Sequence, residues 1–251
     1  MKKVVVAVLL LLTMAAPAVA KSTITLPPGF TQDDFKGLSR DLGLAISYVP
    51  LATAEPLGDK LPGIDIGVEA TAVKLDTDSL YWRKINLYNA AVGNSDIPST
   101  LPFPKAHVQV GLPIIPIDLG FVYSKAPDTD IKYIGGEIKY AILEGTAATP
   151  ALALRGAYTK LSGISDLDIS TRSLDLSISK GFFIFTPYAG YAMVWIESKE
   201  KSPNVVLQDE NMSEGKGFVG CKITFFPFLN MVAEADFAKV DSYSLRLNLS
   251  F

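Results

Sequence analysis

The C-terminal stretch YSLRLNLSF, residues 243–251, decides the fold class. Every odd position from Tyr243 to Phe251 is apolar or aromatic, and every even position is polar. Successive side chains of a β-strand point to opposite sides, so this two-residue period predicts a strand with two chemically distinct faces. One face must lie against an apolar medium, which is either a protein core or lipid.

The same period recurs through the chain from residue 63 onward. The alternating segments lie at 64–71, 107–112, 117–124, 134–142, 152–159, 167–179, 182–197, 219–225 and 230–237. With their flanks they run to about nine residues or more, which suits a tilted membrane crossing better than the five or six residues usual in soluble sheets. The segment 182–197 is strand-like, but Thr186 and Pro187 interrupt its alternation, so its inward face is not assigned. The sequence predicts an all-β fold, a single antiparallel transmembrane β-barrel.

The N-terminal residues predict export. Lys2 and Lys3 precede an apolar run from Val4 to Leu12, and small residues ending in Ala20 follow. This is the pattern of a secretory signal peptide over residues 1–20. The apolar run is too short for a helix that crosses about 30 Å of hydrocarbon. We expect a mature chain from Lys21 in the outer membrane of a diderm bacterium.

Charge and composition exclude several functions. Without Lys2 and Lys3, 21 of the 23 basic residues remain against 26 acidic ones, so no basic surface for a nucleic-acid partner is expected. Cys221 is the only cysteine, which rules out an intramolecular disulfide, and it is expected on the lipid face. One histidine and scattered carboxylates form no ligand cluster, so neither a metal nor a cofactor is expected.

The connections between the alternating segments predict the orientation. Short links at 113–116, 179–182 and 226–229 alternate with longer ones at 125–130, 161–166 and 198–212. Outer-membrane barrels have short periplasmic turns and longer external loops. This orientation predicts two aromatic girdles, one external and one periplasmic. The external girdle contains Tyr123, Tyr158, Phe237 and Tyr243, and the periplasmic one contains Phe183, Phe225, Phe226, Phe228 and Phe251.

Two strand counts are compatible with the pattern. Ten strands beginning near Gly63 leave residues 21–62 as an N-terminal segment before a barrel of residues 63–251. Within it, 31–49 has apolar residues at helical spacing, and Thr31 with Asp34 resembles a helix start, which predicts a helix inside or below the barrel. Residues 38–48 also alternate, and a strand there with another at 79–88 would give twelve. We favour ten, because the segment around Trp82 alternates poorly.

The chain resembles bacterial outer-membrane β-barrels. The alternating C-terminal strand with terminal Phe251 resembles the signal that such proteins present to the barrel assembly machinery. A group of uncharacterised barrel proteins is similar in several stretches, which are 35–50, 54–58, 63–65, 111–113 and 143–145. This resemblance implies the fold and outer-membrane lipid as the surroundings. It implies no chemistry.

The polar positions of the strands predict a charged lumen. By their parity the lumen-lining candidates are Asp65, Glu69, His107, Asp118, Glu137, Lys139, Arg155, Asp175, Lys222, Glu234, Asp236 and Arg246. Arg246 is expected to pair with a carboxylate of a neighbouring strand, one of Glu234, Asp236, Asp65 and Glu69, because an unpaired buried charge costs several kcal/mol. In a narrow ten-stranded barrel such charges line a pore or pair across it.

Three functions remain open at this stage. The favoured expectation is a narrow, porin-like channel or gated transporter for small solutes, with an unknown substrate and the N-terminal helix as a plug. The alternative is a structural or surface-interaction barrel with a filled lumen and binding loops at 79–103 and 198–212. A remote alternative is a hydrolase that uses His107, for which Glu69, Asp118 and Ser124 are possible neighbours without a spacing that singles them out. No enzyme is expected.

Overall fold

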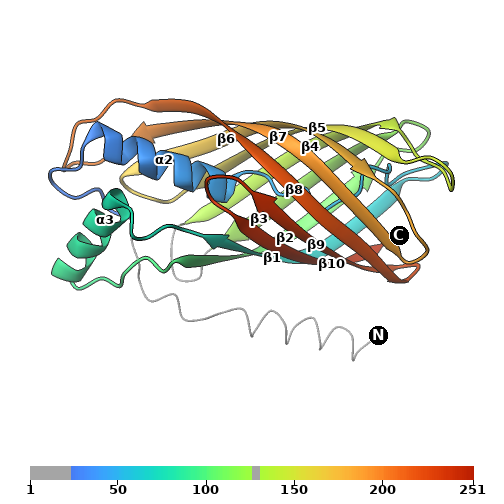
Figure 1. Ribbon diagram of the computed structural model, residues 1–251, viewed down its shortest axis with the longest axis horizontal. Coiled ribbons are helices and arrows are strands. Elements are labelled where there is room, and N and C mark those ends of the chain that lie inside the picture. Colours follow the sequence, from blue (N-terminus) through green and yellow to red (C-terminus); the bar gives the residue numbers. More distant parts are fainter. Residues whose placement is uncertain (1–23, 126–130) are drawn as a thin grey trace.

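The computed structural model describes residues 24–125 and 131–251, so the predicted signal peptide and cleavage site lie outside the described residues. Ten strands form a closed barrel, and two helices lie at one of its ends (Figure 1). The elements are α2 (Gln32–Ile46), β1 (Gly63–Lys74), α3 (Leu80–Ala91), β2 (Thr100–Gly111), β3 (Ile117–Lys125), β4 (Lys132–Leu143), β5 (Ala151–Ser162), β6 (Leu167–Ser179), β7 (Phe185–Glu200), β8 (Glu210–Phe226), β9 (Leu229–Phe237) and β10 (Ser242–Ser250).

Each strand pairs antiparallel with the next, and β1 closes the barrel against β10. In the closing pair Glu69 lies opposite Arg246. The prediction of ten strands is confirmed, and the twelve-strand alternative is wrong. Residues 79–88 contribute no strand because they belong to α3, which buries Trp82, Ile85 and Asn89 at helical spacing.

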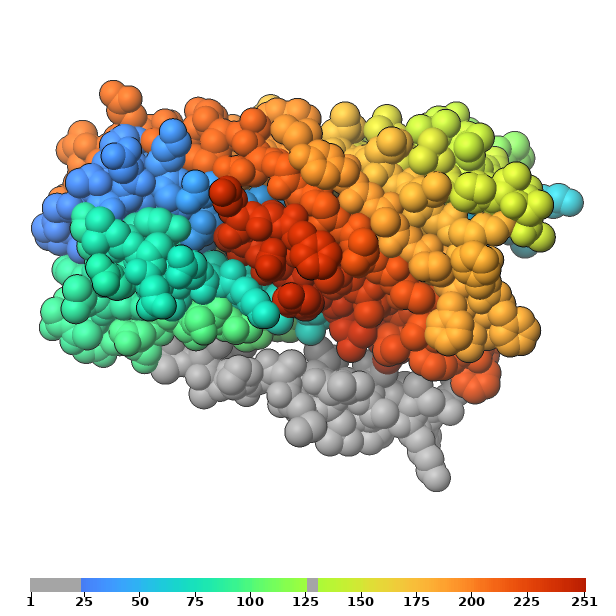
Figure 2. Space-filling view, in the orientation of Figure 1, coloured from blue at the N-terminus to red at the C-terminus, as the bar shows by residue number. Residues whose placement is uncertain are grey.

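Helix α2 begins at the predicted cap. The Thr31 side chain accepts a hydrogen bond from the Asp34 backbone N–H, and the Asp34 carboxylate accepts one from the Thr31 backbone N–H. This reciprocal capping satisfies two N–H groups that a helix start otherwise leaves without partners. The helix packs on β5, β6, β7 and β8 and on α3. Figure 2 shows α2 and α3 together at one end of the molecule.

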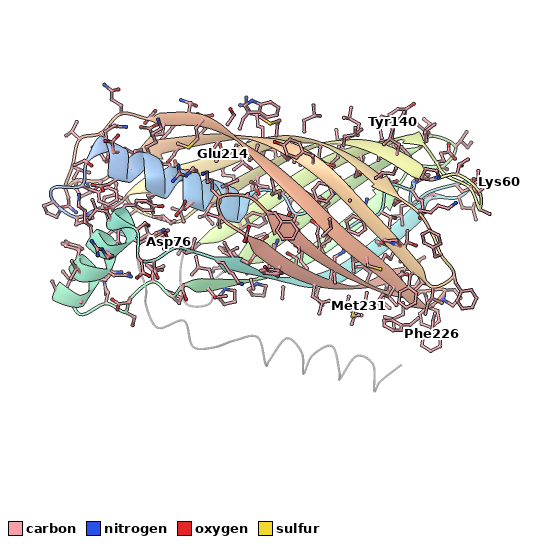
Figure 3. All side chains as sticks on the ribbon, viewed as in Figure 1. Lys60, Asp76, Tyr140, Glu214, Phe226 and Met231 are labelled. Carbon is pink, nitrogen blue, oxygen red and sulfur yellow. The ribbon has the colours of Figure 1, made fainter. Side chains whose placement is uncertain are left out.

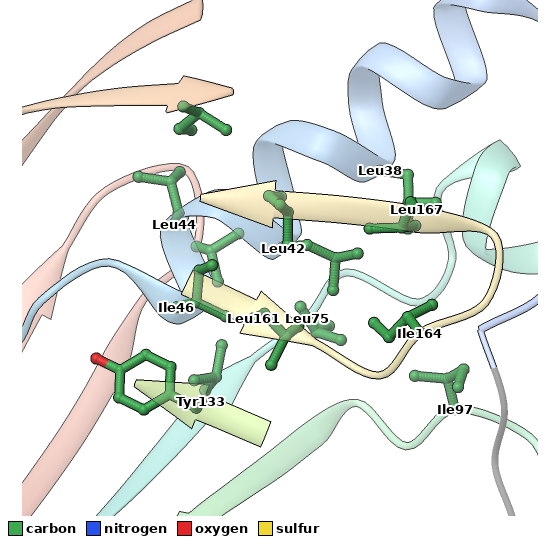
Figure 4. Close-up of a cluster of buried hydrophobic side chains, with 14 of the residues drawn as sticks. Leu38, Leu42, Leu44, Ile46, Leu75, Ile97, Tyr133, Leu161, Ile164 and Leu167 are labelled. Atoms are coloured by element: carbon green, nitrogen blue, oxygen red, sulfur yellow. The ribbon is translucent and has the colours of Figure 1, made fainter. Parts of the chain in front are cut away.

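The end of the barrel that holds α2 has an apolar interior. Leu38, Leu42 and Ile46 of α2 are buried among inward side chains of the wall (Figure 4). The wall contributes Val73, Val122, Tyr133, Leu161, Leu167, Ile169, Val194 and Ile196 to this cluster. A methyl group on Gly43 would lie 2.4 Å from the Ile196 side chain, so the helix backbone lies directly on β7. We call this part of the interior the upper lumen.

The outer surface carries the complementary residues of the alternation. Tyr140 and Phe226 point outward and are 47% and 58% exposed (Figure 3). All nine residues predicted for the two aromatic girdles are exposed. Cys221 also lies on this face, between exposed Val219 and half-buried Ile223. Within the described residues, neither helix has the length and apolar character that a membrane-crossing helix needs.

The two ends of the barrel differ in their connections. At the end that holds α2 and α3 lie the residues between β1 and β2 (75–99) and between β7 and β8 (201–209). At the other end the longest link, between β4 and β5, has seven residues (144–150), and the one between β8 and β9 has two, 227 and 228. The β5–β6 and β9–β10 links at the first end are also short, at four residues each, so the difference lies in the two longest connections. We call the first end the loop end and the other the turn end. In the orientation that the sequence predicts, the loop end would be the external one.

Candidate functional site: the lumen and the segment that fills it

Inside the barrel, the predicted lumen residues are almost all buried. Each of these side chains is at most 6% exposed: Asp65, Glu69, His107, Asp118, Glu137, Lys139, Arg155, Asp175, Glu234, Asp236 and Arg246. Lys222 differs, because it lies half-buried on β8 near the turn end. These charged positions occupy the middle and the turn end of the interior, which we call the lower lumen.

Residues 47–62 run through the lower lumen from the end of α2 to the turn end. The Lys216 ammonium donates to the Tyr48 carbonyl at 2.7 Å. Three residues further along the path, the Arg246 guanidinium donates to the Leu51 carbonyl, and the Leu51 N–H donates to the Glu234 carboxylate at 2.8 Å. Barrel-wall charges from β8, β9 and β10 thus hold the main chain of the segment.

The same type of contact continues toward the turn end. The Lys139 ammonium donates to the carbonyls of Thr53 and Glu55, at 3.0 and 2.7 Å. The Leu57 N–H donates to both oxygens of Asp118, at 3.0 and 3.1 Å. At the turn end, the Asp59 carbonyl accepts from the N–H of Ile114 at 2.7 Å.

These contacts explain why the lumen charges are there. An extended segment inside a protein has backbone N–H and C=O groups that need partners, and no neighbouring strand supplies them here. Hydrogen bonds with one charged partner are about twice as strong as neutral ones. The charged side chains therefore take the place of a sheet partner for the backbone of residues 48–57.

Charges that face each other across strands also form ion pairs. Lys139 pairs with Asp118 at 2.7 Å, and Arg155 lies 3.1 Å from Glu137 and 3.7 Å from Asp175. Two further pairs join Lys105 to Glu69 at 2.8 Å and Lys216 to Asp236 at 3.2 Å. All of these side chains are buried, so each cation compensates a carboxylate that could not stay charged alone.

The predicted partner of Arg246 is wrong. Its guanidinium lies 2.6 Å from His107 Nδ1 and donates to the Leu51 carbonyl, and no carboxylate of the described residues lies within ion-pair distance. Glu69, although opposite Arg246 in the register, pairs with Lys105 instead. Glu234 is engaged by Leu51 and by the Tyr188 hydroxyl at 2.6 Å. Arg246 and Glu234 therefore both bind the N-terminal segment, at Leu51, and not each other. The prediction considered only pairs between strands.

Sequence reasoning missed two lumen cations, Lys105 and Lys216. Lys105 has the same parity as His107 on β2, and Lys216 has the same parity as Lys222 on β8. The alternating segments were read only from residues 107 and 219 onward, whereas the strands begin at Thr100 and Glu210. The parity signal was sufficient, but it was not followed to the loop ends of these strands.

The residues that the sequence offered as catalytic neighbours of His107 make other contacts. Glu69 Oε2 lies 3.4 Å from Nδ1, but Ser124 donates its hydroxyl to the Pro104 carbonyl, and Asp118 binds Leu57 and Lys139. The imidazole has no nucleophile within hydrogen-bond reach among these candidates, which a triad requires. Over residues 24–125 and 131–251, no group of three or more His, Cys, Asp or Glu side chains is arranged to hold a metal ion.

The backbone at Leu51 has an unusual conformation. Its φ is +43°, in the left-handed region, which costs about 1–2 kcal/mol for a residue with a side chain. Leu51 is fully buried in a small cluster with Val49, Tyr188, Phe218 and Val232. The contacts from Glu234 and Arg246 fix its N–H and C=O in this conformation.

At the loop end, two acidic residues connect α2 to α3. Asp41 accepts from the Tyr81 hydroxyl at 2.7 Å and from the Trp82 indole at 2.9 Å. Asp34 accepts from the Lys84 ammonium at 2.5 Å. Burial alone would raise the pKa of the Asp34 carboxyl, but hydrogen bonds from Lys84 and Thr31 outweigh it and hold the pKa below the usual 3.8. The ionised form of Asp34 therefore stabilises the start of α2.

Replacing Asp34 by Asn should loosen α2 in a pH-dependent way. Because the folded-state pKa is lowered, the stabilisation is present above pH 3.8 and is lost as the pH falls through the folded-state value. At pH 7 we expect Asp34→Asn to reduce the amide-exchange protection of residues 32–46 about fivefold, for the loss of ~1 kcal/mol at a helix cap. The difference in amide-exchange protection between the Asp34→Asn variant and the wild type should become smaller as the pH falls toward 3. The exposed neighbour Asp33 gives the control, and an equal effect of Asp33→Asn would contradict the assignment.

Among known proteins, the chain is similar to solved structures at low sequence identity and low TM-score. No family model matches the chain, and no curated protein matches it. Three solved structures to which it is similar are neisserial surface protein A, the attachment invasion locus protein Ail of Yersinia pestis, and the KdgM porin in complex with disordered oligogalacturonate. Their identities are 8%, 12% and 9%, and their TM-scores are 0.32, 0.31 and 0.35. The matches cover 75%, 76% and 75% of this chain and 95%, 97% and 99% of the others.

These structures are bacterial outer-membrane β-barrels. The present chain is itself a closed antiparallel barrel of ten strands, with two short helices among its described residues. The similar structures include a porin and surface proteins.

Proposed function

We propose that the protein is a closed outer-membrane barrel that acts through its loop end at the cell surface, and that it does not form a standing channel. The observation that supports this is the apolar packing of α2 and its flanks in the upper lumen. Eight side chains of the N-terminal segment are no more than 5% exposed there: Leu26, Phe30, Phe35, Leu38, Leu42, Leu44, Ile46 and Tyr48.

The energetics of this packing favour a lasting closure. Transferring one large apolar side chain from the interior to water costs about 1.5–3 kcal/mol. For the whole set, leaving the lumen would cost on the order of 10 kcal/mol or more, and the apolar wall residues would be wetted too. Every 1.4 kcal/mol is a factor of about ten in population, so fewer than about one molecule in a million would be open at equilibrium.

The loop end offers surface for a partner. Helix α3 exposes Leu80 and Leu87, at 55% and 72%, and Arg83 lies on the same face between them; Val92, the C-cap residue, is 51% exposed. Exposed apolar residues next to an arginine are typical of protein-binding surfaces. The buried side of α3 is fixed to α2 by Tyr81 and Trp82, so the exposed face has a defined orientation.

A gated channel is the second candidate, and a different observation favours it. The lower lumen holds residues 48–57 mainly through backbone hydrogen bonds to charged side chains, and water can replace such contacts. If an external force removed α2, the remaining segment would be displaced at a smaller cost, and a charged passage would open. This is the narrow, plugged transporter that the sequence predicted.

The experiment that separates the two functions measures conductance and surface binding. Wild-type protein in planar lipid bilayers is expected to show no steady conductance, because the apolar plug stays in place. Cells that carry Leu87→Asp are expected to lose adhesion to surfaces or to other cells, whereas Leu61→Asp at the turn end, where Leu61 is 77% exposed, should leave adhesion unchanged. Steady solute-permeable conductance of the wild type would refute the closed barrel, and unchanged adhesion of the Leu87 variant would refute the role of α3.

A further inference from the structure

The first described residues of the chain lie at the loop end of the barrel. The Leu26 N–H donates to Asp166, between β5 and β6, at 2.9 Å. The side chain of Gln32 donates to the Gln208 carbonyl at 3.0 Å and accepts from its N–H at 2.9 Å, in the connection between β7 and β8. The chain therefore enters the lumen from the side that carries the longer loops.

The chain reaches the turn end before the first strand begins. Lys60 is exposed there, whereas Asp76, just after β1, lies at the opposite end (Figure 3). Residues 24–62 thus run the whole length of the interior in one direction, and β1 returns in the wall in the other direction. A chain that is exported into the periplasm has to move its N-terminal part across the membrane to reach this arrangement.

At the turn end of the lumen, the segment lies directly against the barrel wall, with no room for a side chain between the two backbones. A methyl group on Gly58 would lie 2.5 Å from the Leu112 carbonyl oxygen, and one on Gly111 would lie 2.2 Å from the Gly58 nitrogen. The extended chain fits there only because the two backbones touch. A helix with its side chains has a diameter of about 10–12 Å, so α2 does not fit through this part of the interior.

The upper lumen has the opposite character. It is wide enough to contain α2 and is lined by apolar side chains that match the apolar stripe of the helix. The stripe is completed only when the segment is helical, because Phe35, Leu38, Leu42 and Ile46 share one face at that spacing. The interior therefore accepts an extended chain at one end and a helix at the other.

We propose that the barrel delivers its own N-terminal end to the cell surface: residues before Pro50 cross the lumen in extended form during assembly and fold into α2 on the loop side. Once folded, the helix is too wide to pass back through the turn end of the lumen. Its apolar face packs against β5 to β8. The folding of α2 on the loop side therefore both completes the crossing of the segment and holds it there. This proposal shares its membrane orientation with the proposed function but needs no partner, no adhesion and no conductance.

Single-cysteine labelling of the full chain on intact cells tests the topology. In a Cys221→Ser background, Lys36→Cys on the exposed face of α2, Lys60→Cys at the turn end and Asp76→Cys at the loop end are each treated with a membrane-impermeant maleimide. We expect Lys36→Cys and Asp76→Cys to be labelled at least tenfold more than Lys60→Cys. After permeabilisation, all three should react equally.

Other labelling patterns overturn the proposal. Labelling of Asp76→Cys without Lys36→Cys would show that α2 has not crossed, and labelling of Lys60→Cys alone would reverse the orientation. Adding Leu38→Pro, which interrupts the helix, tests retention. Labelling at Lys36→Cys should then fall severalfold while labelling at Asp76→Cys persists, and unchanged labelling at both positions would refute locking by the helix. Loss of adhesion or appearance of conductance would concern only the proposed function.

Discussion

Arg155→Leu is expected to lower the free energy of unfolding of the barrel by about 3–5 kcal/mol, the usual cost of removing one partner from a buried ion pair. Arg155 is fully buried and lies between Glu137 and Asp175, at 3.1 and 3.7 Å. Without it the two carboxylates share an enclosed space and repel each other. Urea unfolding in lipid vesicles, followed by tryptophan fluorescence, measures the change.

The controls for this variant are in the same sheet. Arg172 on β6 lies on the outer surface and has no ion-pair partner among the described residues, so Arg172→Leu should change stability by less than about 0.5 kcal/mol. Adding Glu137→Gln and Asp175→Asn to Arg155→Leu should restore part of the loss, because it removes the uncompensated charges. Equal effects of the two arginine substitutions would mean that the lumen charges do not stabilise the barrel.

Phe35→Ala is expected to be the most damaging single change in the N-terminal segment, at about 3–5 kcal/mol for a buried phenylalanine. Phe35 is fully buried between α2 and the apolar wall of the upper lumen. The strands do not depend on this contact, so the loss should appear as local opening of α2. Trypsin cleavage after Lys36 or Arg40 should become much faster, while the heat stability of the barrel changes little.

Lys36→Ala is the matched control, because Lys36 follows Phe35 in the same helix but has an exposed side chain. It should leave cleavage after Arg40 at the wild-type rate. Protection of Arg40 in the Phe35→Ala variant would indicate that the apolar packing does not hold the plug, and the closed-barrel proposal would lose its main support.

The barrel itself was predictable because its signal is local and repeated. Lipid-facing residues such as Leu245 and Leu247 alternate with Arg246 and its neighbours, and β1 begins at Gly63 as predicted. The cap of α2 was equally predictable, since Thr31 and Asp34 satisfy each other within one turn. These features depend on neighbours a few residues apart.

The interior was harder to predict, for two physical reasons. In the upper lumen, Val194 and Ile196 of β7 face inward although they are apolar, so both faces of that strand look alike and the alternation gives no direction. In the lower lumen, wall side chains contact the backbone of residues 48–57, and backbone groups are the same in every sequence. The helix that fills the upper lumen left a pattern in residues 31–49, but the path of residues 48–57 and the partners of Arg246 left none.

Helix α3 was missed for a related reason. Residues 79–88 were expected to be a loop or a strand, and the helix they form has an apolar residue on its exposed side, Leu87, as well as on its buried side, Ile85. An apolar stripe that is not confined to one face gives a weak helical signal. The exposed apolar side is the same feature that supports a binding role.

The left-handed backbone at Leu51 means that residues 47–62 contain one strained residue, which would gain free energy by relaxing. The hydrogen bonds from Leu51 to Glu234 and from Arg246 to Leu51 have to offset the ~1–2 kcal/mol that this residue would regain by relaxing. If a solute or a polypeptide bound Glu234 or Arg246 instead, the strain at Leu51 would favour a change in its backbone conformation. Displacement of the N-terminal segment would then begin at Leu51, in the middle of the lumen, and extend from there toward both ends.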